Sequence, residues 1–162
     1  MVIYGNGRFL LTGKNYSYAM YVNRAGMLQH LYYGKKLEDT DLPFLISQAD
    51  SPDPEDINMD MATDMMPSEC GSFGRGDFKS ATVIVRRSDG AAMSRFRYLS
   101  HTILDGVKPL EGMPCIRHAD QTLTITLKDD FSDTEIDLNY SVSDDSDVLA
   151  RNAAIRNIGK ES

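Results

Sequence analysis

The sequence contains no tryptophan and only two cysteines and three histidines in 162 residues. Cys70 and Cys115 lack a CxxC spacing, so neither a zinc site nor a thiol redox motif is predicted. The two thiols could form a disulfide, but reduced cysteines are the simpler interpretation. His30, His101 and His118 lie too far apart in the sequence to indicate a metal site. We therefore expect no metal, and nothing in the sequence indicates a cofactor.

Positive charge and long apolar runs are also scarce. The formal net charge is −7 and the isoelectric point is near 4.9. Such a balance argues against nucleic acid or an anionic membrane as a partner and leaves neutral sugars and proteins open. Residues 1–8 contain no basic region followed by an apolar stretch. We therefore expect no signal peptide, no transmembrane segment and a cytoplasmic location.

Three glycines lie close together in the segment 68–81, at Gly71, Gly74 and Gly76. This spacing predicts a bend whose backbone takes conformations that favour glycine. Gly74-Arg75-Gly76 is not a dinucleotide-binding fingerprint, because the third glycine is missing and a strand is predicted next.

Most of the chain has the alternation and turn residues of short strands. Residues 148–157 fit a helix or a strand, and we favour a strand because every neighbouring element is one. Asp89-Gly90 predicts a tight hairpin that pairs 82–87 with 95–100. The expected fold is all-β, an antiparallel β-sandwich. Its other predicted strands are 8–12, 17–22, 27–33, 123–128 and 135–142, and 101–104 continues 95–100.

The segment 38–69, called the acidic segment below, has a different composition. It contains ten acidic residues, no lysine and no arginine. Four prolines predict that no regular element longer than a few residues forms there. Composition alone fits a solvated loop. The apolar run 42–46, broken only by Pro43, together with four methionines, favours a loop that is docked on a surface.

Seven stretches, in order along nearly the whole chain, resemble the N-terminal domain of α-galactosidases of glycoside hydrolase family 36. They are residues 15–18, 30–37, 69–78, 97–103, 108–114, 121–127 and 151–152 with 155–157. The resemblance implies a β-supersandwich domain, with residues 1–162 forming its first half, ahead of a (β/α)8 catalytic barrel.

The family reaction that this resemblance implies is retaining hydrolysis of terminal α-1,6-linked galactose, as in melibiose and raffinose-type sugars. Two aspartates of the barrel carry it, a nucleophile and an acid/base. The barrel motifs that hold these aspartates do not occur in residues 1–162. We therefore predict that this chain alone contains no catalytic residue and is inactive.

The resemblance also implies a homo-oligomer, a tetramer at full length, in which a loop of this domain reaches a neighbouring subunit's active site. Asp50 matches the aspartate of that loop that contacts galactose, and carboxylates suit sugar hydroxyls as charged hydrogen-bond acceptors. The loop departs from the family pattern, since no basic residue lies between Lys36 and Arg75, and Lys79 replaces an arginine. Two alternatives are a free-standing carbohydrate-binding module and a structural fragment that self-associates through strand edges.

Overall fold

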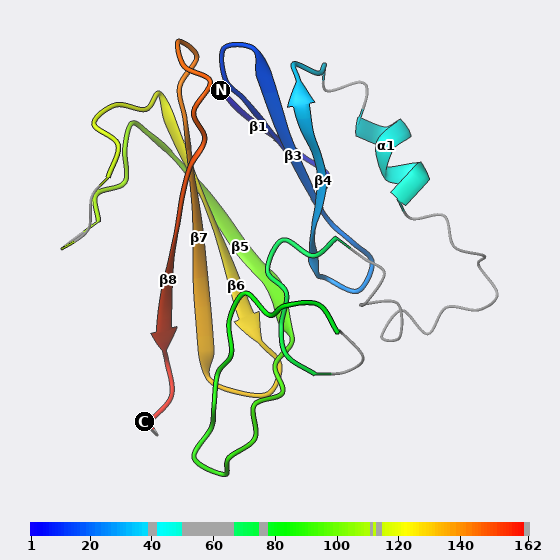
Figure 1. The fold of residues 1–162 in the computed structure, drawn as a ribbon, viewed down its shortest axis with the longest axis vertical. Coiled ribbons are helices and arrows are strands. Elements are labelled where there is room, and N and C mark those ends of the chain that lie inside the picture. The colour runs from blue at the N-terminus through cyan, green and yellow to red at the C-terminus, as the bar shows by residue number, and fades with distance from the viewer. Residues whose placement is uncertain (39–41, 50–66, 75–77, 111, 113–114, 161–162) are drawn as a thin grey trace.

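The computed structural model describes residues 1–38, 42–49, 67–74, 78–110, 112 and 115–160. These residues form two four-stranded antiparallel sheets that face each other, and one helix lies outside the first sheet (Figure 1). The predicted all-β antiparallel sandwich is therefore confirmed. No helix within the described ranges has the length and apolarity needed to cross a membrane.

The first sheet has the strand order of the sequence. A two-residue Asn6-Gly7 turn joins its first two strands, and both turn residues have positive φ, 51° and 75°. This is the turn chemistry that matches the twist of a tight hairpin. The third and fourth strands change register between Ala19 and Met20. The strands are β1 (Val2–Gly5), β2 (Arg8–Thr12), β3 (Tyr16–Val22) and β4 (Leu28–Lys35).

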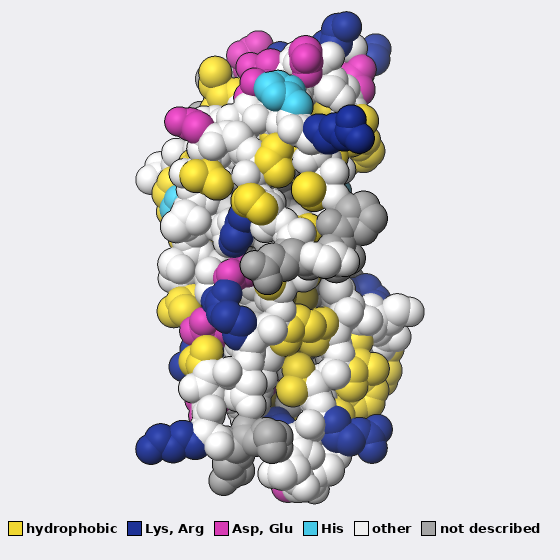
Figure 2. Space-filling model, turned by 90° about the vertical axis from the view of Figure 1, so that its left-hand side faces the viewer, with side chains coloured by type: hydrophobic (Ala, Val, Ile, Leu, Met, Phe, Trp, Pro, Cys, Tyr) yellow, Lys and Arg dark blue, Asp and Glu magenta, His cyan; other side chains and the backbone are white. Residues whose placement is uncertain are grey.

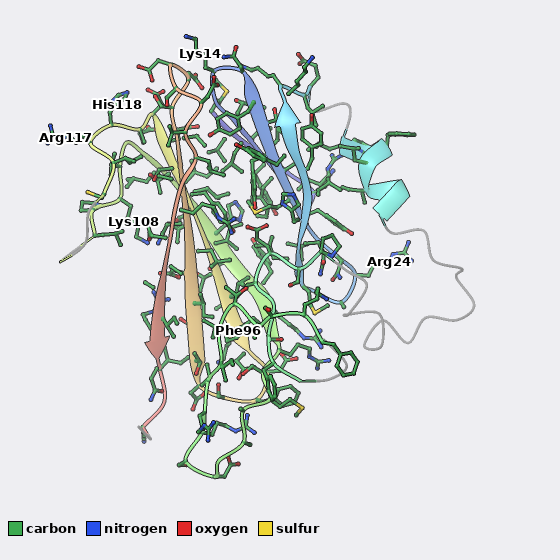
Figure 3. All side chains as sticks on the ribbon, in the orientation of Figure 1. Lys14, Arg24, Phe96, Lys108, Arg117 and His118 are labelled. Carbon is green, nitrogen blue, oxygen red and sulfur yellow. The ribbon has the colours of Figure 1, made fainter. Side chains whose placement is uncertain are left out.

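The second sheet has longer strands, again in sequence order. Its inner face is apolar and its outer face is polar, as the period-two pattern predicts. On the outer face, Lys108 donates hydrogen bonds to Thr124 (3.3 Å) and Asn139 (3.0 Å); its position beside the sheet is labelled in Figure 3. The strands are β5 (Phe96–Asp105), β6 (Gln121–Asp129), β7 (Thr134–Val142) and β8 (Ala150–Asn157).

The main core lies between the two sheets. The first sheet covers the upper part of the second, and the segment that precedes β5 covers the lower end (Figure 1). Burial of these aliphatic and aromatic side chains is the main source of the fold's stability. The fully buried side chains of this main core include Phe9, Leu11, Met20, Leu123, Ile125, Leu127, Ile136, Tyr140 and Val142.

Charged side chains fix the upper end of the sandwich, where the loop before β8 lies beside the N-terminus (Figure 1). The Met1 amine donates to Asp144 (2.7 Å), and Asp147 accepts hydrogen bonds from the backbone and side chain of Asn15 (both 2.8 Å). Figure 2 shows acidic and basic side chains gathered at this end, with hydrophobic ones in small groups elsewhere on the same face. These contacts join the ends of sheets that are distant in sequence.

Two local predictions were wrong, and one strand was missed. The expected hairpin between 82–87 and 95–100 does not form, because β5 pairs with β6 and residues 82–87 contribute only an isolated bridge at Val83. The turn itself exists, since Gly90 N–H donates to Arg87 C=O (2.9 Å). The four prolines do not prevent a regular element in the acidic segment, which contains helix α1 (Leu42–Ala49). Strand β1 was not predicted.

Candidate functional site: the anchors of the acidic segment

Asp50, the predicted galactose contact, lies outside the described residues. The structure does describe the two places where the acidic segment joins the sandwich. One is α1, which ends one residue before Asp50. The other is the stretch 67–70, which leads into the glycine-containing bend.

The first anchor is apolar. Leu42 is fully buried and packs with Leu10 and Ala19, on the outer face of the first sheet. Leu45, one turn further along the helix, adds a partly buried contact, which is the i, i+3 spacing that places two side chains on one helix face. Pro43 sits in the first turn, where its missing N–H costs no helical hydrogen bond. The prediction of a docked segment is therefore confirmed at this end.

The second anchor begins with backbone hydrogen bonds to β4. The His30 N–H donates to Pro67 C=O (2.7 Å), and the Glu69 N–H donates to Leu28 C=O (3.0 Å). Gln29 and Ser68 form an antiparallel bridge between these bonds. Residues 67–69 therefore extend the first sheet by a short piece of strand-like backbone.

The Glu69 side chain then enters the space between the two sheets, where it is 2% exposed. Tyr18 of β3 donates its hydroxyl to the carboxylate (2.7 and 2.8 Å), and Tyr140 of β7 donates to the same group (2.9 Å). Arg151 of β8 completes an ion pair with it. The guanidinium also lies over the rings of Tyr18 (5.6 Å) and Tyr140 (5.1 Å), within range of cation–π attraction.

This group of four side chains, called the Glu69 cluster below, joins both sheets to the end of the acidic segment. A buried carboxylate is tolerated only when charged and polar partners replace the water that it loses. Here two phenols and one guanidinium supply that replacement. His30 lies 3.5 Å from the carboxylate as a further neighbour. The Glu69 carboxylate accepts hydrogen bonds from all three other side chains of the cluster. The cluster is therefore suited to holding the two sheets in a fixed arrangement.

The cluster raises the pKa of its two tyrosines. Burial, followed by the nearby negative charge of Glu69, raises the pKa of Tyr18 and of Tyr140 well above the usual value of 10. Burial is also the main cause that raises the pKa of the Cys70 thiol to about 11. Both cysteines are free thiols, Cys70 buried and Cys115 exposed. The neutral forms of Tyr18, Tyr140 and Cys70 are therefore favoured by folding.

Stability is expected to fall as the pH rises above 10. Unfolded phenols ionise near pH 10, whereas folded Tyr18 and Tyr140 stay protonated, so their contribution is complete below pH 10 and is lost above it. Each should reduce the free energy of unfolding by about 1.4 kcal/mol per pH unit. Urea unfolding at pH 9, 10 and 11 measures this slope. In Tyr140→Phe, the slope of unfolding free energy against pH should lose the contribution of one tyrosine. Equal slopes in the two proteins would show that Tyr140 does not contribute to the pH dependence.

The three histidines remain apart. The His101 Nδ1 lies 2.7 Å from the Tyr98 hydroxyl, and His30 lies beside Glu69. Figure 3 shows His118 in the loop before β6, on the far side of the second sheet from α1. Among the described residues, no group of three His, Cys, Asp or Glu side chains is placed to bind a metal ion.

The Glu69 cluster was not predicted as a unit. Glu69 and Arg151 belong to two of the stretches that resemble the family, but they are 82 residues apart. Two paired charges at that separation give no periodic signal. The sequence offers one hint of a special role for Glu69. It is the last residue of the acidic segment and stands directly before Cys70 and the glycine bend.

Comparison with known proteins identifies the family. The model of the glycosyl hydrolase family 36 N-terminal domain matches residues 26–162, so the chain belongs to this family. Alpha-galactosidase Mel36A of Lactobacillus acidophilus is 33% identical over 165 residues, covering 97% of this chain and 22% of that protein. The bifunctional alpha-galactosidase/sucrose kinase AgaSK of Mediterraneibacter gnavus is 31% identical, covering 93% and 17%. The resemblance seen in the sequence motifs is confirmed.

Solved structures agree with the sandwich. Alpha-galactosidase AgaB from Geobacillus stearothermophilus matches with a TM-score of 0.83 and 30% identity, covering 99% of this chain and 23% of that one. AgaA from the same organism, in a variant solved in complex with raffinose, matches with a TM-score of 0.81 and 27% identity. The chain thus spans about a fifth of the length of the curated relatives it matches, from 17% to 22% for the two described above.

Proposed function

We propose that this chain is the non-catalytic N-terminal domain of a cytoplasmic α-galactosidase that hydrolyses terminal α-1,6-linked galactose in melibiose and raffinose-type sugars. The domain supports the catalytic barrel and a homotetramer. Its acidic segment completes the active site of a neighbouring subunit, where Asp50 contacts the galactose.

One observation carries this proposal: the family model matches residues 26–162, and each relative described above is an α-galactosidase of which this chain covers about a fifth. The raffinose bound to a related AgaA variant supports the substrate class. The two anchors support the role of the acidic segment, because they attach the described residues at both of its ends to the sandwich.

The test compares the 162-residue chain with the longer polypeptide. The chain alone should not release nitrophenol from a nitrophenyl α-galactoside, whereas the longer polypeptide should. In the longer polypeptide, Asp50→Ala should raise KM about ten- to hundredfold, the usual cost of one hydrogen bond to a charged group. Turnover by the 162-residue chain would refute the non-catalytic role, and saturable galactose binding by it would favour a free-standing carbohydrate-binding module.

A further inference from the structure

We propose that His101 is an acid-sensitive contact that holds the β1–β2 hairpin against the second sheet. At neutral pH the imidazole is uncharged and packs among aromatic rings of the first sheet. In acid it takes up a proton and the contact loosens. This inference is independent of the proposed function, because it concerns a side chain between the two sheets, outside the acidic segment.

A register shift in β5 brings His101 to the inner face of the second sheet beside Tyr98. Residues three apart in a regular strand point to opposite faces of the sheet. The pairing of β5 with β6 shifts between Tyr98 and Ser100. As a result both side chains lie opposite residues of the main core, Leu127 and Ile125. The Tyr98 hydroxyl therefore lies within hydrogen-bond distance of the His101 Nδ1 (2.7 Å).

The first sheet meets His101 with aromatic rings. The centroid of the imidazole lies 4.0 Å from that of the Tyr4 ring on β1 and 5.1 Å from that of the Phe9 ring on β2. Phe9 is 0% exposed and Tyr4 is 43% exposed, so this group lies where the main core meets solvent. The beginning of β1 is held separately, because the Val2 N–H donates to the Gln121 side chain (2.7 Å). The rings around His101 therefore hold the other end of β1.

No charged partner is available to a proton on His101 within the described part of the chain. The titratable groups that face the imidazole are two phenols, Tyr4 of β1 and Tyr98 of its own strand. The side chains that β2 and β6 present to it are the apolar ones named above. The histidines with a carboxylate neighbour are His30 and His118. A charge on the imidazole would therefore lose water without gaining a counter-ion.

The pKa directions agree with this geometry. Burial lowers the pKa of His101 below its ordinary value of 6.5. Burial, followed by the Tyr4 phenol, raises the pKa of Tyr98, so that hydroxyl stays protonated as the pH falls. The contribution of His101 to stability is therefore complete above about pH 6.5, the value for an unfolded histidine. It is lost as the pH falls through the lower pKa of the folded state.

The experiment measures hydrogen exchange of the β1–β2 hairpin in the 162-residue chain from about pH 7.5 to pH 5, corrected for the intrinsic effect of pH on amide exchange. The equilibrium constant for opening should rise by up to about tenfold per pH unit, because the opened hairpin binds one more proton. His101→Phe keeps a ring at this position but cannot take up a proton, so its hairpin should stay protected. His118→Gln, in the loop before β6, is the matched control and should behave like the unaltered chain. Amides of β7 report any effect of acid on the whole sandwich.

A proton NMR titration of the His101 ring tests the same contact directly, and it serves where His101→Phe does not fold. A pKa below that of an unfolded histidine supports the proposal. A pKa at or above about 6.5 would overturn it, and would show that attraction of the imidazolium for the rings of Tyr4 and Phe9 outweighs burial. An equal response of the hairpin to acid in His101→Phe and in the unaltered chain would also overturn it.

Discussion

Replacing Glu69 with alanine is expected to lower the free energy of unfolding of this chain by about 3–5 kcal/mol, because two buried phenols lose their hydrogen-bond acceptor at a cost of about 1–3 kcal/mol each and an ion pair is broken. The carboxylate is 2% exposed and accepts hydrogen bonds from Tyr18, Tyr140 and Arg151. Without it, two phenols lose their acceptor, and Arg151, whose side chain is 46% exposed, loses its counter-ion. Urea-induced unfolding at pH 7, followed by tyrosine fluorescence, measures the change.

Two variants separate the buried charge from other effects. Glu69→Gln keeps an acceptor for the tyrosines but removes the charge, so it should cost less than Glu69→Ala. Glu135→Ala removes a carboxylate whose partner Arg156 also binds Asp137, and should cost at most about 1 kcal/mol. Equal losses for Glu69→Ala and Glu135→Ala would show that the Glu69 cluster does not join the sheets.

The sequence was sufficient to predict those strands in which apolar and polar residues alternate and the apolar face is buried. The pattern of 123–128 and 135–142 predicted β6 and β7, because each strand buries one face between the sheets and pairs on both sides. The favoured strand at 148–157 is β8; its strand character was inferred from the neighbouring elements, and the structure pairs it with β7. These are elements in which local pattern and tertiary contacts agree.

The same alternating pattern was misleading at residues 82–87, which bury the side chains of one face but do not pair with a strand of either sheet. Val83 and Val85 pack against the main core, while Ile84 is 62% exposed, so the residues alternate as in a strand. Their backbone, however, has only the bridge to Ser72 within the described part of the chain. Periodicity reports side-chain burial, and hydrogen-bond partners depend on which segments the fold brings together.

For the candidate site, the sequence predicted the docking of the acidic segment but not its means. The apolar run that contains Leu42 was recognised, whereas the helix was missed because Pro43 was taken as a breaker instead of a first-turn residue. Glu69 was part of a family stretch without a role. Its role depends on Tyr140 and Arg151, which come from a sheet formed 71 and 82 residues later.

Phe9→Ala is expected to have an effect of similar size, about 3–5 kcal/mol of unfolding free energy. Phe9 is 0% exposed on β2 and faces the second sheet. Its ring contacts Tyr4 (4.9 Å), His101 (5.1 Å) and Tyr98 (6.2 Å), so it joins both sheets on the side opposite β8. Alanine would leave a cavity that these neighbours, fixed in strands, could fill only in part. Thermal and urea unfolding measure the loss.

A matched substitution tests whether the position or the residue type is responsible. Phe73→Ala removes the same side chain from a site that is 52% exposed, and should cost about 1 kcal/mol or less. Phe9→Leu keeps much of the volume and should fall between the two. If Phe9→Ala cost no more than Phe73→Ala, the aromatic contacts of Phe9 would not hold the sheets together. In that case the Glu69 cluster and the aliphatic core would hold the two sheets together without a contribution from Phe9.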